Sequence, residues 1–285
     1  MAISRRHLLR RASWFAFSML GTLGVSSVSA GSNKLSGSAP ADSKDSVPGF
    51  DEFLRERGYV AVSPAPLLTG HPFNGGLRYD DIAATVGDSQ YIKQQCARVE
   101  DAGKKGTPGT LPLFTIIGLN TSTPALARTA SNLFLEYLTK VVQLDPARLR
   151  VTTTDNSAVF FPLLAKWGIT AKQIRIRQWQ EAVTAGSGSG YFAPDGHPDG
   201  ASAPSYSLEY VMPNGSEIEI AEITHDPAGI SGRSSGGIGV ERVEMARTGQ
   251  PIAWADRLAL FNRLVNEESS KTNVMLPPGV AAINN

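Results

Sequence analysis

In residues 206–224, YSLEYVMPNGSEIEIAEIT, apolar and polar side chains alternate on both sides of an Asn-Gly turn. This pattern predicts two antiparallel strands joined by a tight hairpin turn. The alternation divides the second strand between two faces, with Ile218, Ile220 and Glu222 on one and Glu217, Glu219, Ala221 and Ile223 on the other.

The same alternation predicts further strands along the chain. They are residues 59–62, 111–117, 149–153 and 174–179, together with the segment around Arg98. Residues 102–110 are rich in Gly, Lys, Thr and Pro, so they are expected to join two of these strands as a hairpin loop.

Helices are predicted between the strands. They begin near Phe50 and at Thr123, cover residues 157–167 and 253–266, and follow the glycine-rich segment at residues 236–239. Several strands are hairpin partners, not members of a regular strand–helix alternation. The expected fold class is therefore α+β, with a mainly antiparallel sheet flanked by helices.

Residues 1–30 have the pattern of a twin-arginine export signal, with Arg5-Arg6 before an apolar run at residues 12–25 and small residues up to Ala30. The run is shorter than the roughly 20 residues of a membrane anchor, which favours a signal. Residues 31–47 are predicted to be a disordered linker, and residues 48–285 one domain. We expect an exported protein, periplasmic or extracellular, that meets the membrane only through its signal; a cytoplasmic location is the alternative.

Charge and cysteine content exclude several function classes. The formal net charge is +1, which gives no overall attraction to nucleic acid. Cys96 is the only cysteine, so an internal disulfide and a cysteine-based metal cluster are excluded. Because Cys96 lies in a predicted strand, we expect it to be a buried packing residue and not a reactive thiol.

Two segments could hold an arginine against a polyphosphate. Residues 94–101, QQCARVED, contain Arg98, and residues 236–242, GGIGVER, contain Arg242 at a predicted helix start. The planar guanidinium group suits phosphate oxygens better than a lysine does. The simpler alternative is that both arginines form ordinary ion pairs at a sheet edge.

These two segments, R-x-E and then a glycine-rich segment ending in E-R, resemble motifs 2 and 3 of the class II aminoacyl-tRNA synthetases. Four blocks are similar to the archaeal-type alanyl branch of that family: FDEFLRERGYVAVSPAPLL at residues 50–68, QWQEAVTAGSGSGYFAP at 178–194, SEIEIAEIT at 216–224, and SGGIGVERVEMARTGQPI at 235–252. The resemblance covers about residues 50 to 255 and implies a class II synthetase-like fold.

The resemblance implies an alanine-tRNA-ligase-like activity, in which ATP activates a small amino acid as an aminoacyl adenylate with the help of Mg²⁺. The implied catalytic residues are Arg98, Glu100 and Arg242, and the implied ATP site adds Gly237 and Gly239. Glu219 would hold the metal, and Trp179, Glu222 and Ser235 would bind the amino acid.

The chain departs from the family at several positions. Ser235 stands where the family has an aspartate that pairs with the substrate ammonium group, which argues against free alanine. Glu222, on the neighbouring strand, could supply the missing charge. Thr115 replaces a family glutamate, and Thr110-Leu111 an Arg-His pair.

The partners follow from the same resemblance. The part of the chain after Arg242 has room for one or two helices, so we expect no tRNA-binding domain of its own, and tRNA stays an open partner. The resemblance allows a homodimer through motif 1, an arrangement that is less regular in the alanyl branch. An exported chain would meet almost no ATP, so the alternative function is an exported, non-catalytic protein that keeps the synthetase fold and binds a small amino-acid-like ligand.

Overall fold

The computed structural model describes residues 47–64, 67, 73–74, 89–98, 102–121, 129–185, 191–192, 203–225 and 234–272. The described residues belong to one compact unit, Asp45–Asn285. The predicted signal, and the predicted linker up to residue 46, lie outside them. Within the described part, no helix combines the length and apolar character needed to cross a membrane.

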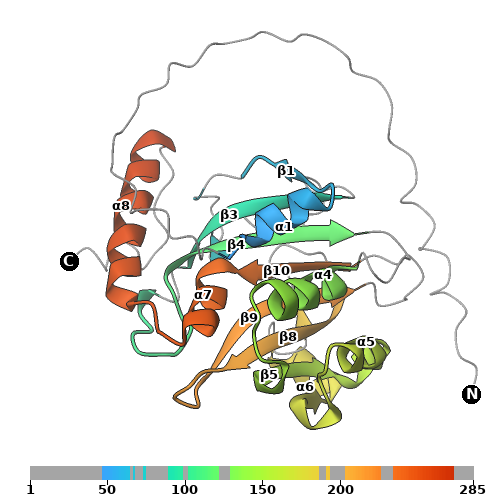
Figure 1. Ribbon diagram of the computed structural model, residues 1–285. Coiled ribbons are helices and arrows are strands. Elements are labelled where there is room, and N and C mark those ends of the chain that lie inside the picture. The colour runs from blue at the N-terminus through green and yellow to red at the C-terminus, as the bar shows by residue number, and fades with distance from the viewer. Residues whose placement is uncertain are drawn as a thin grey trace, which may run out of the picture. The chain divides into compact units, whose positions relative to one another are not determined.

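A single large sheet runs through the unit. Its strands are β1 (Val60–Val62), β2 (Phe73–Asn74), β3 (Gln90–Arg98), β4 (Leu113–Thr121), β5 (Leu149–Thr154), β6 (Ile174–Arg177), β7 (Tyr191–Phe192), β8 (Ala203–Val211), β9 (Glu217–His225) and β10 (Ser234–Gly239). They lie in the order β1-β3-β4-β10-β9-β8-β5-β6, with β2 on β3 and β7 on β8 (Figure 1).

The sheet is mixed, which corrects the predicted mainly antiparallel sheet. β1 is parallel to β3, and β5 is parallel to β6, so parallel pairs close both ends of an antiparallel centre. β5 and β6 are joined by a crossover that contains a helix, and such a crossover makes neighbouring strands parallel. Alternation within one strand does not reveal the direction of its neighbour.

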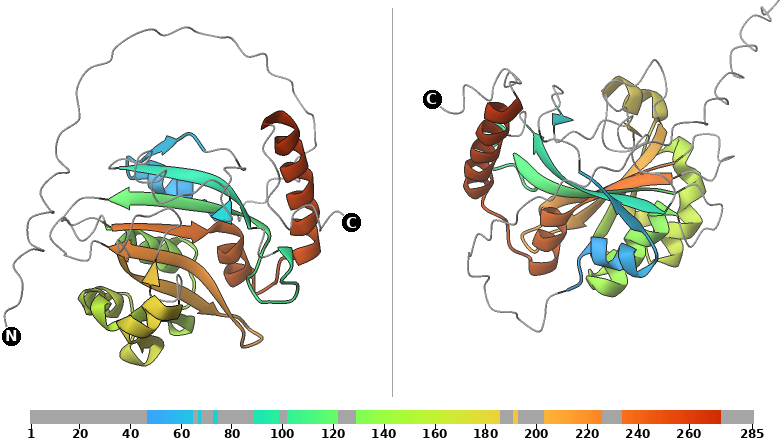
Figure 2. Two further views of the ribbon diagram at one scale, coloured as in Figure 1. Left: turned by 180° about the vertical axis from the view of Figure 1, so that it is seen from behind. Right: turned by 90° about the horizontal axis from the view of Figure 1, so that it is seen from above.

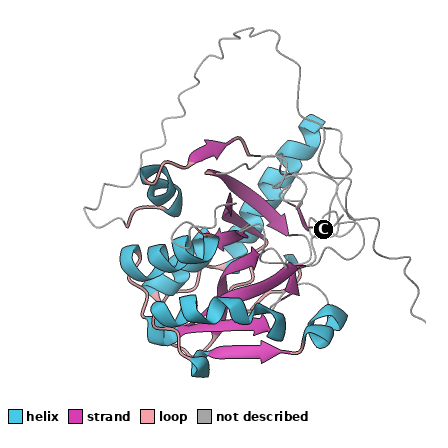
Figure 3. Cartoon of the chain, turned by 90° about the vertical axis from the view of Figure 1, so that its right-hand side faces the viewer, coloured by secondary structure: helices cyan, strands magenta, loops and turns pink. Residues whose placement is uncertain are grey.

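The helices are α1 (Phe50–Glu56), α4 (Ala130–Glu136), α5 (Phe161–Lys166), α6 (Trp179–Ala185), α7 (Val240–Thr248) and α8 (Trp254–Thr272), and a π-helical turn, η2 (Tyr137–Val141), extends α4. α1, α4, α5 and α7 cover one face of the sheet (Figures 2 and 3). The main apolar core lies between these helices and the sheet, with Phe53, Phe134, Leu138 and Ile223 almost completely buried.

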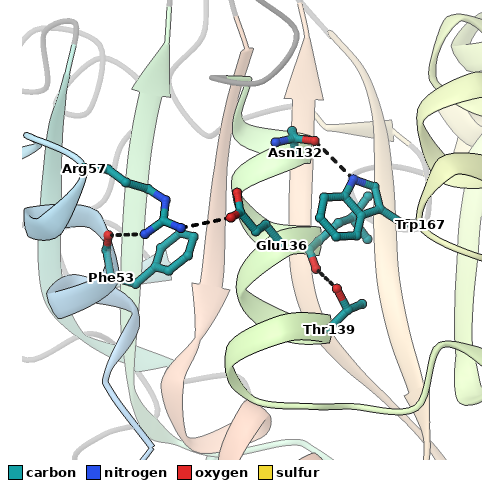
Figure 4. A network of polar contacts seen from close by, with 7 residues as sticks. Phe53, Arg57, Asn132, Glu136, Thr139 and Trp167 are labelled. Carbon is teal, nitrogen blue, oxygen red and sulfur yellow. Dashed lines mark hydrogen bonds and ion pairs between the residues drawn. The ribbon is translucent and has the colours of Figure 1, made fainter.

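Polar contacts join the helices of this layer (Figure 4). The Arg57 guanidinium donates to the Phe53 carbonyl at the end of α1 and to the Glu136 carboxylate of α4, at 3.2 and 2.9 Å. The indole N–H of Trp167 donates to the Asn132 side-chain oxygen at 3.1 Å. These contacts fix α4 between α1 and the end of α5.

Several predicted boundaries differ from the structure; the helix predicted at residues 157–167, for example, is α-helical only over Phe161–Lys166. The strand expected at residues 174–179 ends at Arg177, and Trp179 begins α6, where its N–H donates to Asp155 Oδ1 at 3.0 Å. The helix start expected at Thr123 falls outside the described residues. The described helix α4 begins at Ala130, where Thr129 Oγ1 accepts the Asn132 N–H.

The helix side also contains a cavity of about 230 Å³ between α1, η2 and α7. Phe50, Ile238 and Val243 are among its apolar lining residues, and ion-paired Lys93 and Arg247 lie at it. None of the candidate catalytic, nucleotide-binding, metal or amino-acid-binding residues that the structure describes lines it.

Candidate active site

The face of the sheet that points away from α4 carries the candidate site, and we call it the polar face. Gly236 shows which residues of β10 face the helices. A Cβ atom at Gly236 would lie 2.5 Å from the Phe134 ring of α4, so this residue points to the helix side. Neighbouring residues of a strand point to opposite sides, so Ser235 and Gly237 belong to the polar face.

Cross-strand register extends the polar face in two rows, because paired residues of neighbouring strands share a side. The first row is Gly118, Gly237, Glu222, Ser207 and Thr152. The second row is Ser235, Thr224 and Ser205. Glu222 thus lies between two glycines on one side and two hydroxyl residues on the other.

A β-bulge brings Glu219 and Glu222 to the same face, which corrects the predicted alternation. The register between β8 and β9 shifts between Leu208 and Glu209, where Ile220 is the extra residue. As a result Ile218, Ile220, Ala221 and Ile223 all join the helix-side core. Simple alternation had placed Ala221 and Ile223 with Glu219, and Glu222 with the isoleucines.

Arg242 reaches the polar face from the first turn of α7. Its Nε donates to the Gly109 carbonyl at 2.9 Å, and its Nη1 lies 3.3 Å from Glu219 Oε1. The guanidinium carbon is 5.0 Å from the centroid of the Phe114 ring, and only 12% of the side chain is exposed. The protein therefore fixes the plane of this guanidinium group before any ligand binds.

Arg98 lies at the end of β3 on the same side of the sheet. Ile92 pairs with Gly118 and therefore points to the polar face. Every second residue of β3 points the same way, so Cys96 and Arg98 also belong to this face. The positive charges of Arg98 and Arg242 both lower the pKa of the Glu222 carboxyl and the pKa of the Cys96 thiol. The structure thus brings two arginines from distant motifs within electrostatic reach of the same groups.

The Glu222 carboxyl has a raised pKa. Burial is the main cause, and the neighbouring Glu219 carboxylate adds to it. A hydrogen bond from Ser205 Oγ and the positive charges of Arg98 and Arg242 act in the opposite direction. A cationic ligand group at this point would favour the charged form of Glu222.

Cys96 is 1% exposed, which confirms the prediction of a buried packing residue. Burial raises the pKa of its thiol to about 12, so the thiol stays protonated at neutral pH.

The alternative of ordinary ion pairs at a sheet edge would join Glu241 to Arg242, but the Glu241 carboxylate pairs elsewhere. Its carboxylate accepts hydrogen bonds from the backbone N–H and the hydroxyl of Thr115, at 2.7 and 3.2 Å, and pairs with Arg257 at 3.2 Å. Thr115 and Phe114 are neighbours on β4 and point to opposite faces. In the first turn of α7, Glu241 therefore holds the helix to β4, and Arg242 extends to the polar face.

The glycines of the second motif serve close packing. At Gly237 a Cβ atom would lie 3.0 Å from Ile116 Cγ2, and at Gly239 it would lie 3.3 Å from the Arg242 side chain. Gly239 therefore lets the Arg242 side chain fold back over the end of β10. Gly237 and Gly118 carry no side chains themselves, and the side chains of Ile116 and Ile92 lie against them.

The remaining predicted residues are placed as follows. The Ser235 hydroxyl forms a hydrogen bond with the Thr224 hydroxyl on the next strand. Trp179 begins α6, next to the end of β6, and is half-buried. Glu100 lies outside the described residues. Among the residues that the structure describes, no group of three or more His, Cys, Asp and Glu side chains could hold a metal ion.

The polar face also contains residues that the sequence analysis missed: Thr152 on β5 and Ser205, Ser207 and Glu209 on β8. The signal was present in the sequence, since these three β8 residues alternate with Tyr206, Leu208 and Tyr210. The alternation identified β8 as a strand, but only its register with β9 places these residues beside Glu222.

Two solved structures are similar to this chain at low scores. Aspartyl-tRNA synthetase from Entamoeba histolytica is 18% identical over 74% of this chain and 55% of that chain, with a TM-score of 0.37. Histidyl-tRNA synthetase from S. aureus, in its apo form, is 11% identical over 76% of each chain, with a TM-score of 0.32. The match thus spans about half the length of the aspartyl enzyme. No protein-family model and no curated protein sequence matches the chain.

Proposed function

We propose that this chain is an amino-acid-activating enzyme of the class II synthetase type, alanyl-like in its motifs, which uses ATP and Mg²⁺ to form the adenylate of a small amino acid. The observation that supports the proposal is that Arg98 and Arg242 lie on one side of the sheet and both lower the pKa of the Glu222 carboxyl. Two positive charges on one side of the sheet suit a polyphosphate.

The reaction needs mainly positioning and positive charge. A carboxylate oxygen of the amino acid attacks the α-phosphorus of ATP, a new O–P bond forms, and the bond to the β-phosphate breaks to release pyrophosphate. Negative charge builds on the phosphate oxygens, so fixed guanidinium groups stabilise the transition state. We assign Arg98 to the α-phosphate and Arg242 to the γ-phosphate, with Glu100 orienting the nucleotide.

The surface beside Glu222 suits both ligands. Gly118 and Gly237 pair with each other beside Glu222 and carry no side chains, and we assign the adenylate to this part of the sheet. Mg²⁺ is commonly held by one or two carboxylates together with substrate phosphates, and Glu219 is the residue that we assign to it. Magnesium would then compete with Arg242 for the Glu219 carboxylate, which lies 3.3 Å from Nη1.

The substrate amino group is assigned to Glu222. Ser235 uses its hydroxyl toward Thr224, and a neutral hydroxyl cannot balance an ammonium charge. Glu222 lies one strand away and carries a carboxyl that burial keeps partly protonated. Trp179 stays a proposed residue of the amino-acid site, although it follows β6, at the edge of the sheet and three strands from β9.

The test is amino-acid-dependent exchange of pyrophosphate into ATP by the purified protein, with each standard amino acid in turn. We expect exchange with a small amino acid, and a loss of at least tenfold in Arg242→Ala. Arg247→Ala is the control, because Arg247 is on the same helix but pairs with Glu244 on the surface. The absence of exchange with every amino acid would refute the activity.

One observation favours a second function, an exported binding protein without catalysis. The Ser235 hydroxyl is satisfied by Thr224 and offers no carboxylate where the family has one. This function predicts amino-acid binding by calorimetry without pyrophosphate exchange. Cell fractionation that finds a chain shortened by about thirty residues, the length of a typical signal, would support export.

A further inference from the structure

Two hydroxyl groups on the polar face are buried without hydrogen-bond partners. They are Ser207 Oγ on β8 and Thr154 Oγ1 on β5. Both residues are 0% exposed. A buried hydroxyl without a partner costs free energy, and such groups in folded proteins are rare enough that each one needs an explanation.

Both hydroxyls lie near Glu222. Ser207 is the register partner of Glu222, so the two side chains share a side of the sheet. Thr152 pairs with Ser207, and Thr154, two residues further along β5, lies on the same side. The unpartnered hydroxyls therefore occupy the side of Glu222 away from the glycines and arginines.

Neighbouring polar groups on this surface are already paired with one another. Ser205 Oγ donates to Glu222 Oε1 at 3.4 Å, and Thr224 pairs with Ser235. Glu209 forms a hydrogen bond with Thr152, and its other carboxyl oxygen, Oε2, is buried without a partner. Ser207 and Thr154 are thus the hydroxyl groups left for a ligand held by Glu222.

We propose that Ser207 and Thr154 determine specificity, and that the ligand is a small amino acid with a side-chain hydroxyl, such as serine, rather than alanine. This inference deepens the proposed function, since it rests on Glu222 holding the substrate amino group. The ligand hydroxyl donates to one of the two oxygens and accepts from the other. Both hydroxyls are fully buried, so a side chain of few atoms is required.

The physical basis of the preference is the cost of unpaired groups. Alanine has no hydroxyl group and would leave Ser207 and Thr154 without partners. Sites built to hydrogen-bond a substrate hydroxyl reject an analogue that lacks it by up to about 10⁴–10⁵-fold. Here only a hydroxyl pair is involved, so we expect serine to bind at least about tenfold more tightly than alanine.

The experiment measures the dissociation constants of serine and alanine by calorimetry with the full chain, in the presence of Mg²⁺ and a non-hydrolysable ATP analogue. Ser207→Ala and Thr154→Val should each reduce the serine-to-alanine ratio toward one. The control is Ser131→Ala, which removes an equally buried hydroxyl from α4 on the other side of the sheet. This control should leave the ratio unchanged.

The outcomes separate this inference from the proposed function. A serine preference that Ser207→Ala abolishes supports the inference even if pyrophosphate exchange is absent. Exchange that proceeds equally well with alanine overturns the inference and leaves the proposed function standing. Equal binding of both amino acids, no binding of either, or an equal loss of preference in Ser131→Ala would also overturn it.

Discussion

Glu222 and Glu209 show how single residues on the polar face respond to burial. Both have a raised pKa, and in both burial is the largest cause. The charges of Arg98 and Arg242 lower the pKa of Glu222, which is consistent with a ligand-binding role. Glu209 is further along the strand and has a carboxyl oxygen, Oε2, without a hydrogen-bond partner.

Glu209 predicts a pH-dependent stability. Its pKa is raised from 4.5 to about 7, against the opposing effects of Thr152 and Arg175 and with Glu217 and Glu219 adding to the shift. Between these pH values the unfolded chain releases the proton while the folded chain keeps it, so stability falls as pH rises. Glu209→Gln should flatten this part of a curve of melting temperature against pH. An unchanged slope would contradict the assignment.

Gly236 is predicted to be intolerant of a side chain. A Cβ atom there would lie 2.5 Å from Phe134 and 2.8 Å from the Glu222 backbone oxygen. Gly236→Ala should therefore destabilise the protein by about 1–3 kcal/mol in urea unfolding. Gly103→Ala is the matched control, because a Cβ atom at that position meets nothing within 4 Å. Equal effects of the two changes would contradict the packing described for α4 on β10.

At the scale of elements, α7 is fixed to the sheet by its first turn. Glu241 satisfies the Thr115 backbone N–H, which lies just beyond the last paired residues of β4 and β10. Glu241→Ala should cost about 1–3 kcal/mol, because that N–H loses its partner. It should also weaken ATP binding, since Arg242 is the next residue of the same turn. Denaturation and calorimetry on the same variant test both effects, and a variant with wild-type stability would contradict them.

The sequence predicted the elements better than their arrangement. The hairpin of β8 and β9 and the burial of Cys96 followed from local alternation and turn residues. The bulge at Ile220 did not, because an extra residue in one strand becomes visible only against the register of its partner. For the same reason the sequence placed Glu219 and Glu222 on opposite faces, and missed Ser207 as a neighbour of Glu222.

For the whole molecule, the two faces of the sheet have different roles. The helices that cover one face of the sheet (Figure 2) bury the main apolar core. The polar face on the other side contains charged and hydroxyl residues from β3, β5, β8, β9 and β10. The helix layer holds the strands in register, and that register brings motifs from distant parts of the chain together. Function is therefore expected to depend on the integrity of the entire sheet.

The most direct test of the shared site is a double-mutant cycle on ATP binding. The affinity of the Mg²⁺ complex of ATP is measured by calorimetry for the wild type, Arg98→Ala, Arg242→Ala and the double variant. If both guanidinium groups contact one triphosphate, each single change weakens binding by at least about tenfold, and the double change costs less than the sum of the two. If ATP binds the wild type and all three variants equally, or binds none of them, the polar face is not a nucleotide site.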